Sequence, residues 1–323
     1  MQKVSVIIPN YNGEQYIRTC LDSLAAQTLK EVPVIVVDNG SKDQSVQIIR
    51  EEYPYVTLLE LDTNYGFCRA VNEGIRAAQT EYVILLNNDV RVAEDFAEML
   101  VQTMDADAAL FSCQAKMLQM DRPELIDNAG DFYTALGWAV TRGKDMRSEL
   151  FEARTSIFSA CAGAAIYRRR LFEKVGYFDE KHFAYLEDVD IGYRARLAGF
   201  QNAYEPSAIV WHKGSAVTGS RHNAFKVRSA ARNNLYLIYK NMPLWQFWIN
   251  FPLLITGWMV KFLFFLAKGL GGAYISGLWQ GILMARKGRK VPYLAENCDN
   301  CWKIQLELWQ NLRFLFRKNR RIP

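Results

Sequence analysis

Three acidic residues, Glu187, Asp188 and Asp190, lie close together in an aromatic and aliphatic stretch that begins at Phe183. Apolar residues recur there every four positions up to Gly199, which predicts a short helix that begins near Asp188. A carboxylate held at that point among apolar neighbours can take a proton from a hydroxyl group, as a general base does. The same pattern would also suit an acidic helix cap that only stabilises the helix.

A second group of polar residues follows three apolar runs, at 4–8, 34–37 and 82–86. Each run is typical of a buried strand, and each ends abruptly in amides or carboxylates. In open α/β sheets, ligands bind just beyond the carboxyl ends of the strands, so we expect these three ends to meet at one edge. The polar residues concerned are Asn10, Tyr11, Asn12, Asp38, Asn39, Asn87, Asn88 and Asp89.

The first 115 residues alternate between strand and helix patterns. Strands are expected at 4–8, 33–38, 55–60, 82–87 and 108–112, with helical periodicity between them. This alternation predicts an α/β fold with a mostly parallel central sheet and helices on both faces. No Gly-x-Gly-x-x-Gly sequence follows the first strand, so the fingerprint of a dinucleotide-binding domain is missing.

Two later segments have patterns of their own. The polar segment 119–155, which contains three well-separated glycines, predicts a loop that shapes a pocket. Residues 221–241 predict a helix that leads into a strongly apolar region.

The composition limits the class of protein. The chain has 323 residues, half of them hydrophobic, which is ample for one large domain or for one domain with an appendage. The first residues lack the hydrophobic core of a signal peptide, and the six cysteines have no disulfide-framework spacing. Cys298 and Cys301 form a lone pair without a nearby histidine, so we expect no zinc site and a reducing, cytoplasmic location.

The positive charge is concentrated at the C-terminal end of the chain. The net charge is +5, but residues 286–323 alone carry ten Lys or Arg and three acidic residues. Such a basic end can bind nucleic acid or an anionic membrane surface. The preceding segments 242–260 and 269–285 are uncharged and rich in tryptophan, as at a bilayer interface, which favours the membrane and argues against nucleic acid. A buried helical subdomain is the alternative.

The apolar segments could lie on a membrane or cross it as a hairpin. A span needs about 20 apolar residues. The first segment barely reaches that length and contains Pro243, Gln246, Asn250 and Pro252. We therefore favour helices that lie in the interface, with lysine and arginine reaching the phosphates, over a hairpin that spans the bilayer.

Six motifs in this chain resemble, in type and order, those of family 2 glycosyltransferases. The resemblance covers roughly residues 4–240 and is greatest to the rhamnosyltransferase-like subgroup, which builds bacterial surface polysaccharides. The motifs are Val4-Ser-Val-Ile-Ile-Pro-Asn-Tyr-Asn-Gly13, Val37-Asp-Asn-Gly-Ser41, Asn64-Tyr-Gly-Phe67 with Asn72, Leu86-Asn-Asn-Asp-Val90, Glu187-Asp188 and Trp211-His212.

The resemblance implies a GT-A fold for residues 1–240, followed by a membrane-associating helical tail at 241–323. It implies an inverting enzyme that takes a sugar, such as rhamnose, from a dTDP- or UDP-sugar with the help of Mg²⁺ or Mn²⁺. The acceptor is expected to be a lipid-linked saccharide, and the enzyme is expected to be peripheral or monotopic at the cytoplasmic face of the cell membrane. A non-catalytic sugar-nucleotide-binding or scaffold partner of a polysaccharide assembly is the alternative function.

The family motifs also imply roles for individual residues in binding the donor. Pro9, Tyr11 and Asn12 would line the base and ribose, and Asp38 would bond the uracil or thymine edge. The other residues expected to border the nucleotide and the donor sugar are Asn64, Gly66, Asn72 and Asn87.

The remaining motifs imply which residues bind the metal and which residue acts as the base. Asn87-Asn88-Asp89 occupies the family's Asp-x-Asp position, which leaves Asp89 as the carboxylate ligand. His212 would be a second contact to the metal or pyrophosphate, unless it only packs or caps. Asp188 is the expected base, with Glu187 and Asp190 as orienting groups. Asp190 lies two positions along the helix from Asp188 and is expected to point elsewhere. Trp138 would either stack on an acceptor sugar or anchor its own loop.

Overall fold

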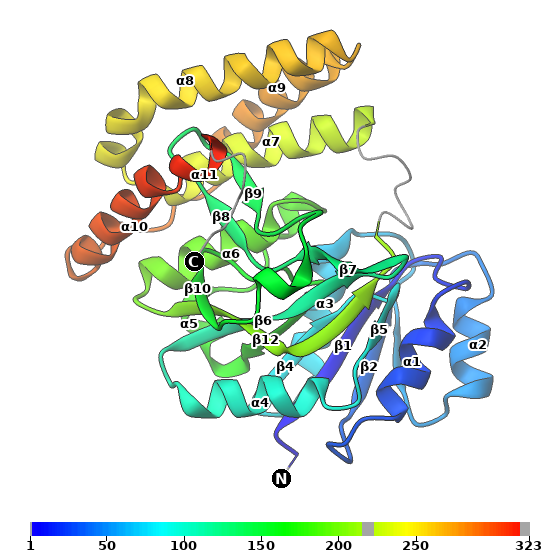
Figure 1. Cartoon of the computed structure of the whole chain (residues 1–323). Coiled ribbons are helices and arrows are strands. Elements are labelled where there is room, and N and C mark those ends of the chain that lie inside the picture. Colours follow the sequence, from blue (N-terminus) through cyan, green and yellow to red (C-terminus); the bar gives the residue numbers. More distant parts are fainter. Residues whose placement is uncertain (1, 215–222, 317–323) are drawn as a thin grey trace.

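The structure is a computed structural model that describes residues 2–214 and 223–316. A twisted sheet forms its centre, and Figure 1 shows a group of C-terminal helices gathered at one end of the sheet domain. The N-terminus lies at the opposite end.

Ten of the described strands form one mixed sheet. The order along the sheet is β10-β12-β6-β11-β4-β1-β2-β3, with β5 paired to β12 and β7 paired to β6. The strands are β1 (Val4–Asn10), β2 (Val34–Asp38), β3 (Thr57–Glu60), β4 (Tyr82–Leu86), β5 (Val90–Val92), β6 (Leu110–Gln119), β7 (Arg122–Asn128), β10 (Thr155–Ile157), β11 (Ala164–Arg168) and β12 (Gln201–His212), while β8 (Asp131–Tyr133) and β9 (Ala139–Thr141) form a separate hairpin.

The α/β fold class is confirmed, with one refinement of the sheet. Strands β3, β2, β1 and β4 are parallel, as the alternating pattern predicts. Strand β11 then runs antiparallel to both β4 and β6, so the whole sheet is mixed.

Helices cover both faces of the sheet because successive side chains of a buried strand point to opposite sides. In β1, Val6 and Ile8 join one hydrophobic cluster and Ile7 joins the other. Helices α1 (Ile17–Ala25), α2 (Ser45–Glu52) and α4 (Phe96–Ala106) cover the first face, and α3 (Phe67–Ala77), α5 (Phe172–Val175) and α6 (Glu187–Leu197) cover the second. Single turns of 3₁₀-helix are η1 (Ser148–Leu150), η2 (Arg169–Leu171), η3 (Glu180–His182) and η4 (Ala295–Asn297).

The prediction that segment 119–155 forms a loop is wrong. It holds the end of β6, strands β7, β8 and β9, and η1. The first three residues of strand β7 are exposed, and its sequence lacks the apolar run that marks a buried strand. The glycines at 130, 137 and 143 have positive φ angles, which fit the turns between these short strands.

The C-terminal helices are part of the same folded body as the sheet. They are α7 (Ala224–Asn241), α8 (Leu244–Ala267), α9 (Gly271–Lys287), α10 (Cys298–Gln310) and α11 (Arg313–Phe316). Leu254 of α8 and Ile304 of α10 share a hydrophobic cluster with Val189 and Tyr193 of α6. The predicted boundary between residues 240 and 241 falls at the end of α7, yet side chains from both sides of it complete one core.

Helix α8 exposes much of its apolar surface. In the part of the chain that the structure describes, α8 is the one helix long and apolar enough to cross a membrane, and only 17% of its most apolar window is buried. The alternative of an ordinary buried helix therefore does not describe α8. The basic residues at 317–323 lie outside the described residues.

Candidate active site

The three strand ends meet, as their sequences predict. The Asn10 side chain, at the end of β1, donates a hydrogen bond from Nδ2 to Asp38 Oδ1 over 2.8 Å. Its Oδ1 accepts one from Asn88 Nδ2, after β4, at the same distance. Asn10 is buried, so one amide fixes the spacing of the three ends of the parallel strands.

The turns after β1 and β2 are locked together around Ser41. The buried carboxylate of Asp38 accepts hydrogen bonds from the Ser41 backbone and hydroxyl. The same hydroxyl accepts a bond from the backbone N–H of Asn12, and Asn12 Oδ1 accepts one from Lys42 N–H. Pro9 and Tyr11, both half-buried, flank this junction, so the four residues expected at the nucleotide base lie in one place.

A third turn, Asn64 to Gly66, completes this edge. Asn39 donates hydrogen bonds from Nδ2 to Asn64 Oδ1 and to the Gly66 carbonyl, both over 3.0 Å. Gly66 has a φ of 88°, and a Cβ there would lie 2.6 Å from the ring and carbonyl of Phe183. Glycine is thus required, because this turn is packed against the segment that precedes the acidic motif.

Asn72 has a different place from the one expected. It is buried on α3, and its Nδ2 donates to the Phe178 carbonyl and to Glu180 Oε1. Its Oδ1 accepts a hydrogen bond from Phe178 N–H. The amide is therefore used inside the protein, where it fastens the 178–180 segment to α3.

Asp89 and His212 form a pair at the end of the sheet. His212 Nε2 lies 3.2 Å from Asp89 Oδ1, and Asn87 Nδ2 lies 3.5 Å from the same nitrogen. The antiparallel pairing of β12 with β5 places His212 opposite Val90 and so brings it to Asp89. His212 Nδ1 lies 2.8 Å from Asp127 Oδ2, and Asp127 also binds the Lys144 ammonium group.

Asp127 was not predicted from the sequence, because it lies in the exposed strand β7. A carboxylate behind a histidine is the usual partner that orients a metal-binding imidazole. Burial alone would lower the pKa of His212, but hydrogen bonds with Asp127 and Asp89 outweigh it and raise the pKa to about 9. The two carboxylates therefore favour a positive charge at His212.

Asp89 and His212 could supply two ligands to a divalent cation, although the described residues contain no group of three His, Cys, Asp or Glu side chains placed to hold one. Two neighbouring ligands of an octahedral ion with bonds of about 2.1 Å lie about 3 Å apart. The 3.2 Å between Asp89 Oδ1 and His212 Nε2 agrees with that spacing.

Asp188 lies at the first turn of α6, beside two other carboxyl groups. Its Oδ1 accepts a hydrogen bond of 3.0 Å from the Ala162 backbone N–H. Burial, followed by the charges of Glu187 and Asp131, raises the pKa of Asp188 well above its usual value. Glu187 is buried too, and no described residue donates a hydrogen bond to its Oε2.

Asp131 is a second residue that the sequence did not reveal. It belongs to β8, inside the segment predicted as a loop, and burial raises its pKa to about 6. Its backbone pairs with Ser159, which brings β8 alongside the segment that leads to Ala162. Asp188 therefore belongs to a cluster of three carboxyl groups.

Asp190 points away from this cluster, as predicted. It is fully buried and binds Arg194 and Lys240 over 2.8 and 2.9 Å, and Asn241 donates to its other oxygen. Burial would raise its pKa, but the two cations outweigh that effect and hold the pKa far below its usual range.

Trp138 is attached to helix α8. Its Nε1 donates a hydrogen bond of 3.2 Å to the Gly257 carbonyl, and the Lys261 ammonium lies 5.5 Å from the ring centre. These contacts favour the anchoring role for Trp138, while stacking on an acceptor sugar stays a prediction.

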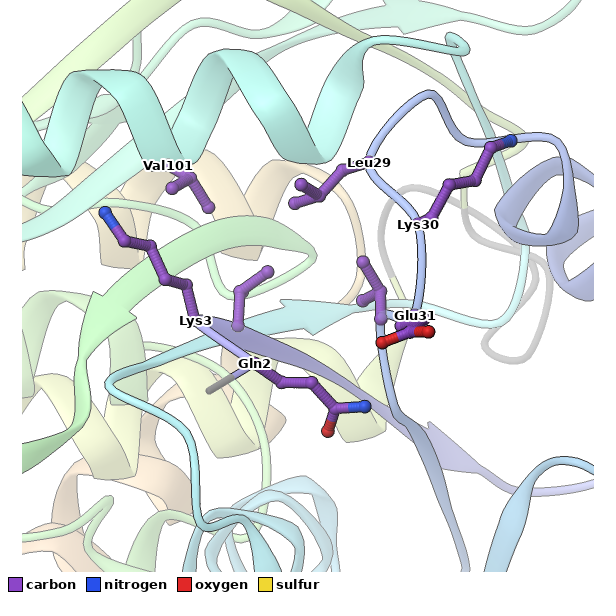
Figure 2. Close-up of a pocket in the computed structure, with 8 residues that line it drawn as sticks. Gln2, Lys3, Leu29, Lys30, Glu31 and Val101 are labelled. Carbon is purple, nitrogen blue, oxygen red and sulfur yellow. The ribbon is translucent and has the colours of Figure 1, made fainter.

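Among the residues that the structure describes, two cavities beside the sheet bear on the location of the site. One, of about 560 Å³, lies at the start of β1, opposite the polar strand ends, and Figure 2 shows Gln2, Lys3, Leu29 and Val101 on its walls. The other, of about 200 Å³, adjoins the Asp89–His212 pair. It is lined by Gln119, Met120, Asp121, Arg122, Asp127, Lys144, Lys213 and Gly214. Ligands of open α/β sheets bind at the carboxyl ends of strands, so the first cavity is not the active-site candidate.

Solved structures share this fold. Staphylococcus aureus TarS 1-349 in complex with UDP-GlcNAc has a TM-score of 0.59 at 20% identity, over 97% of this chain and 92% of that one. GalNAc-T7 with UDP, GalNAc and Mn²⁺ has a TM-score of 0.60 at 16% identity, over 74% of this chain and 48% of that one. At these identities the likeness concerns the GT-A fold alone.

Sequence relatives include bacterial glycosyltransferases. The N-acetylglucosaminyl-diphospho-decaprenol L-rhamnosyltransferase of Mycobacterium tuberculosis is 28% identical over 240 residues, which are 66% of this chain and 77% of that one. The poly-beta-1,6-N-acetyl-D-glucosamine synthase of Staphylococcus epidermidis is 21% identical over 217 residues, which are 65% of this chain and 50% of that one.

The family model described as glycosyl transferase family 2 matches residues 5–176, which is more than half of the chain. This match covers four of the six motifs quoted above, including both acid-bearing strand ends. The rhamnosyltransferase relative confirms the resemblance to that subgroup. The chain belongs to glycosyltransferase family 2.

Proposed function

We propose that the protein is an inverting, metal-dependent glycosyltransferase that transfers a sugar, such as rhamnose, to a lipid-linked saccharide during polysaccharide synthesis. The observation that carries this proposal is that two adjacent residues, Ala162 and Gly163, contact both candidate sites. Ala162 N–H donates to the Asp188 carboxylate, and the next residue, Gly163, accepts a hydrogen bond of 2.9 Å from Asn87 N–H. The candidate base and the candidate metal site therefore lie on either side of Ala162 and Gly163.

This arrangement suits a single displacement. Asp188 would take the proton of the acceptor hydroxyl as that oxygen attacks the anomeric carbon. Its raised pKa makes it a stronger base than an ordinary aspartate once it is ionised. A cation held by Asp89 and His212 would supply positive charge for the departing diphosphate. Glu187 and Asp131 would tune the pKa of Asp188 rather than react.

The donor would be a UDP- or dTDP-sugar bound over the turns that contain Pro9, Asn12 and Asp38. The structural neighbours bound to UDP and to UDP-GlcNAc support this class of donor. Mn²⁺ in the GalNAc-T7 structure supports a divalent cation. The mycobacterial relative's name describes a saccharide on a diphospho-lipid, which supports a lipid-linked acceptor. A non-catalytic binding partner would not need Asp188, Asp131 and Glu187 clustered together.

The enzyme would lie on the cytoplasmic face of the membrane through one side of α8. Exposed apolar residues recur there at intervals of four or seven positions, so they share one side of the helix. The opposite side contacts the protein along most of its length, and buried Asn250 exchanges hydrogen bonds with Gln305. A helix held in this way is suited to lie in the interface rather than to span the bilayer. The residues with this spacing are Leu244, Trp248, Ile255, Met259 and Leu263, and Ile249, Val260, Phe264 and Leu266 of α8 are exposed as well.

Replacing the base should separate chemistry from binding. We expect Asp188→Asn to lower turnover by about 10²- to 10⁴-fold, because general-base catalysis is lost. Donor affinity should stay near that of the wild type, because Asp188 does not touch the strand ends that hold the nucleotide. The measurements are nucleotide diphosphate release and donor binding with a panel of UDP- and dTDP-sugars. Wild-type turnover in the folded variant would remove Asp188 from this role.

The pH dependence of turnover should reflect the interactions among Asp188, Glu187 and Asp131. The acid limb of the turnover profile follows ionisation of Asp188, whose pKa is raised partly by the charge of Asp131. Asp131→Asn removes that charge, so the limb should move to lower pH. Glu124→Gln, at an exposed position on β7, is the matched control and should leave the limb in place. An unchanged limb in Asp131→Asn would show that the two carboxyl groups do not interact.

Activity should depend on a divalent cation. A chelator should stop turnover and Mg²⁺ or Mn²⁺ should restore it, while Asp89→Ala should weaken donor binding. Asp127→Asn should weaken metal affinity by about 10- to 100-fold, because it no longer orients His212. Glu152→Gln, which removes the exposed carboxylate of another ion pair with lysine, should not. Full activity in excess chelator would contradict the metal site.

Membrane binding should depend on the exposed side of α8. Removing residues 241–323 would uncover the shared core, so point substitutions are the cleaner test. We expect the intact protein to bind vesicles of phosphatidylcholine and phosphatidylglycerol. The triple variant Trp248→Ser, Met259→Ser, Leu263→Ser should bind at least about tenfold more weakly, because apolar burial supplies much of the affinity. Tyr55→Ser, at an exposed aromatic remote from α8, is the control, and an intact protein that ignores anionic vesicles would refute the proposal.

A further inference from the structure

The segment just before the acidic motif has a strained backbone. Phe183, Tyr185 and Leu186 have φ angles of 61°, 75° and 67°, in the left-handed region that side chains with a Cβ avoid. Three such residues within four positions persist only if the surroundings hold them, and strain of this kind concentrates at functional sites. This segment, residues 183–186, ends where α6 begins, so its conformation determines where Glu187 and Asp188 lie.

One side chain on α7 holds the segment. The amide nitrogen of Asn233 lies 2.9 Å from the His182 carbonyl, 2.8 Å from that of Ala184 and 2.7 Å from that of Tyr185. Asn233 is completely buried, in the middle of the helix. A buried amide that meets three carbonyls of one segment is unusual, because most side-chain hydrogen bonds go singly to backbone or water.

The orientation of this amide is itself fixed. Arg232 donates from Nε to Asn233 Oδ1 over 2.9 Å and from Nη2 to the His182 carbonyl over the same distance. An arginine can only donate, so the oxygen of Asn233 must face Arg232 and its nitrogen must face the carbonyls. Loss of the amide would leave the carbonyls of His182, Ala184 and Tyr185 with fewer donors.

The same segment joins the donor edge to the catalytic helix. The Phe183 carbonyl accepts a hydrogen bond of 2.7 Å from Phe67 N–H, directly after the Asn64–Gly66 turn. The Leu186 carbonyl accepts one of 3.0 Å from Asp190 N–H, which begins α6. A shift of the segment would therefore move Asp188 relative to the donor edge.

We propose that Asn233 is a positioning residue for the transfer reaction. By holding residues 183–186 in their strained conformation, it sets the place of the Asp188 carboxylate relative to the donor. This inference rests on the proposed function, in which Asp188 is the base. Asn233 itself touches neither the candidate metal site nor the strand ends, so its effect is on turnover rather than on donor affinity.

The test compares two adjacent buried asparagines of α7 in the full-length protein. Asn233→Ala removes the amide from the segment, and Asn233→Asp keeps its size but replaces the donor with an acceptor. Asn234→Ala is the matched control, because Asn234 is also buried but its Oδ1 accepts a hydrogen bond from Tyr133, away from the segment. The two alanine variants thus each remove a buried amide from the same helix, at different places.

The first measurement is steady-state kinetics with UDP-GlcNAc and dTDP-rhamnose as donors. We expect kcat of Asn233→Ala to fall by about 10- to 100-fold, the cost of a small misplacement of a catalytic group, with KM for the donor within about twofold. The kcat of Asn233→Asp should fall at least as far. Asn234→Ala should keep kcat within about threefold of the wild type even if its melting temperature falls equally. Equal losses of kcat in the two alanine variants would overturn the proposal.

The second measurement does not require activity. Hydrogen exchange should become faster at the amides of residues 183–190 in Asn233→Ala and should stay as in the wild type there in Asn234→Ala. Unchanged exchange in Asn233→Ala would overturn the proposal even if the enzyme is active. If the wild type releases no nucleotide from either donor but the exchange result holds, then the assumed donors and the proposed function are at fault, and the positioning of the segment stands.

Discussion

The rest of the structure depends on the two ion pairs and the hydrogen bond that the buried carboxylate of Asp190 makes. A fully buried charge costs several kcal/mol unless it is paired and hydrogen-bonded. Asp190 meets Arg194 from its own helix, and Lys240 and Asn241 from the end of α7. These contacts fix α6, which carries Asp188, to α7, which carries Asn233. Asn233 is the residue that holds the strained segment 183–186. Helix α7 packs in turn on α9, where a Cβ at Gly277 would lie 2.4 Å from the Arg228 carbonyl. The active site and the apolar helices are thus connected by buried contacts.

Two groups of opposite character lie on either side of Ala162 and Gly163. On one side, His212 is held between Asp89 and Asp127, and its raised pKa reflects a place that favours positive charge. On the other, Glu187, Asp188 and Asp131 are crowded among apolar neighbours, so each holds its proton more tightly than an exposed carboxyl group would. The first environment suits a cation and a diphosphate, and the second suits proton transfer. The different chemical roles proposed for the two groups follow from their different burial and charge.

Local sequence predicted the parts of the site that follow buried parallel strands. Asp38 and Asp89 come directly after apolar runs, and the register of β1 with β2 then brings Asn10 opposite Asp38. Asp127 and Asp131 were missed, because their strands are short, exposed or irregular and carry no apolar run. Asn233 was missed for another reason: a single polar residue in a helix gives no sign that it faces the interior. Its role depends on a segment some fifty positions away, which only the fold brings near.

The central claim is that one carboxylate base and one cation-held diphosphate act on opposite sides of the sugar. Such an arrangement corresponds to one direct displacement, in which the acceptor oxygen attacks the anomeric carbon as the diphosphate leaves. Proton NMR of the first product formed from an α- or β-linked nucleotide sugar of known configuration tests this claim most directly. The account predicts that the anomeric configuration of the transferred sugar is inverted. A product with retained configuration would contradict it and would require a different assignment of Asp188.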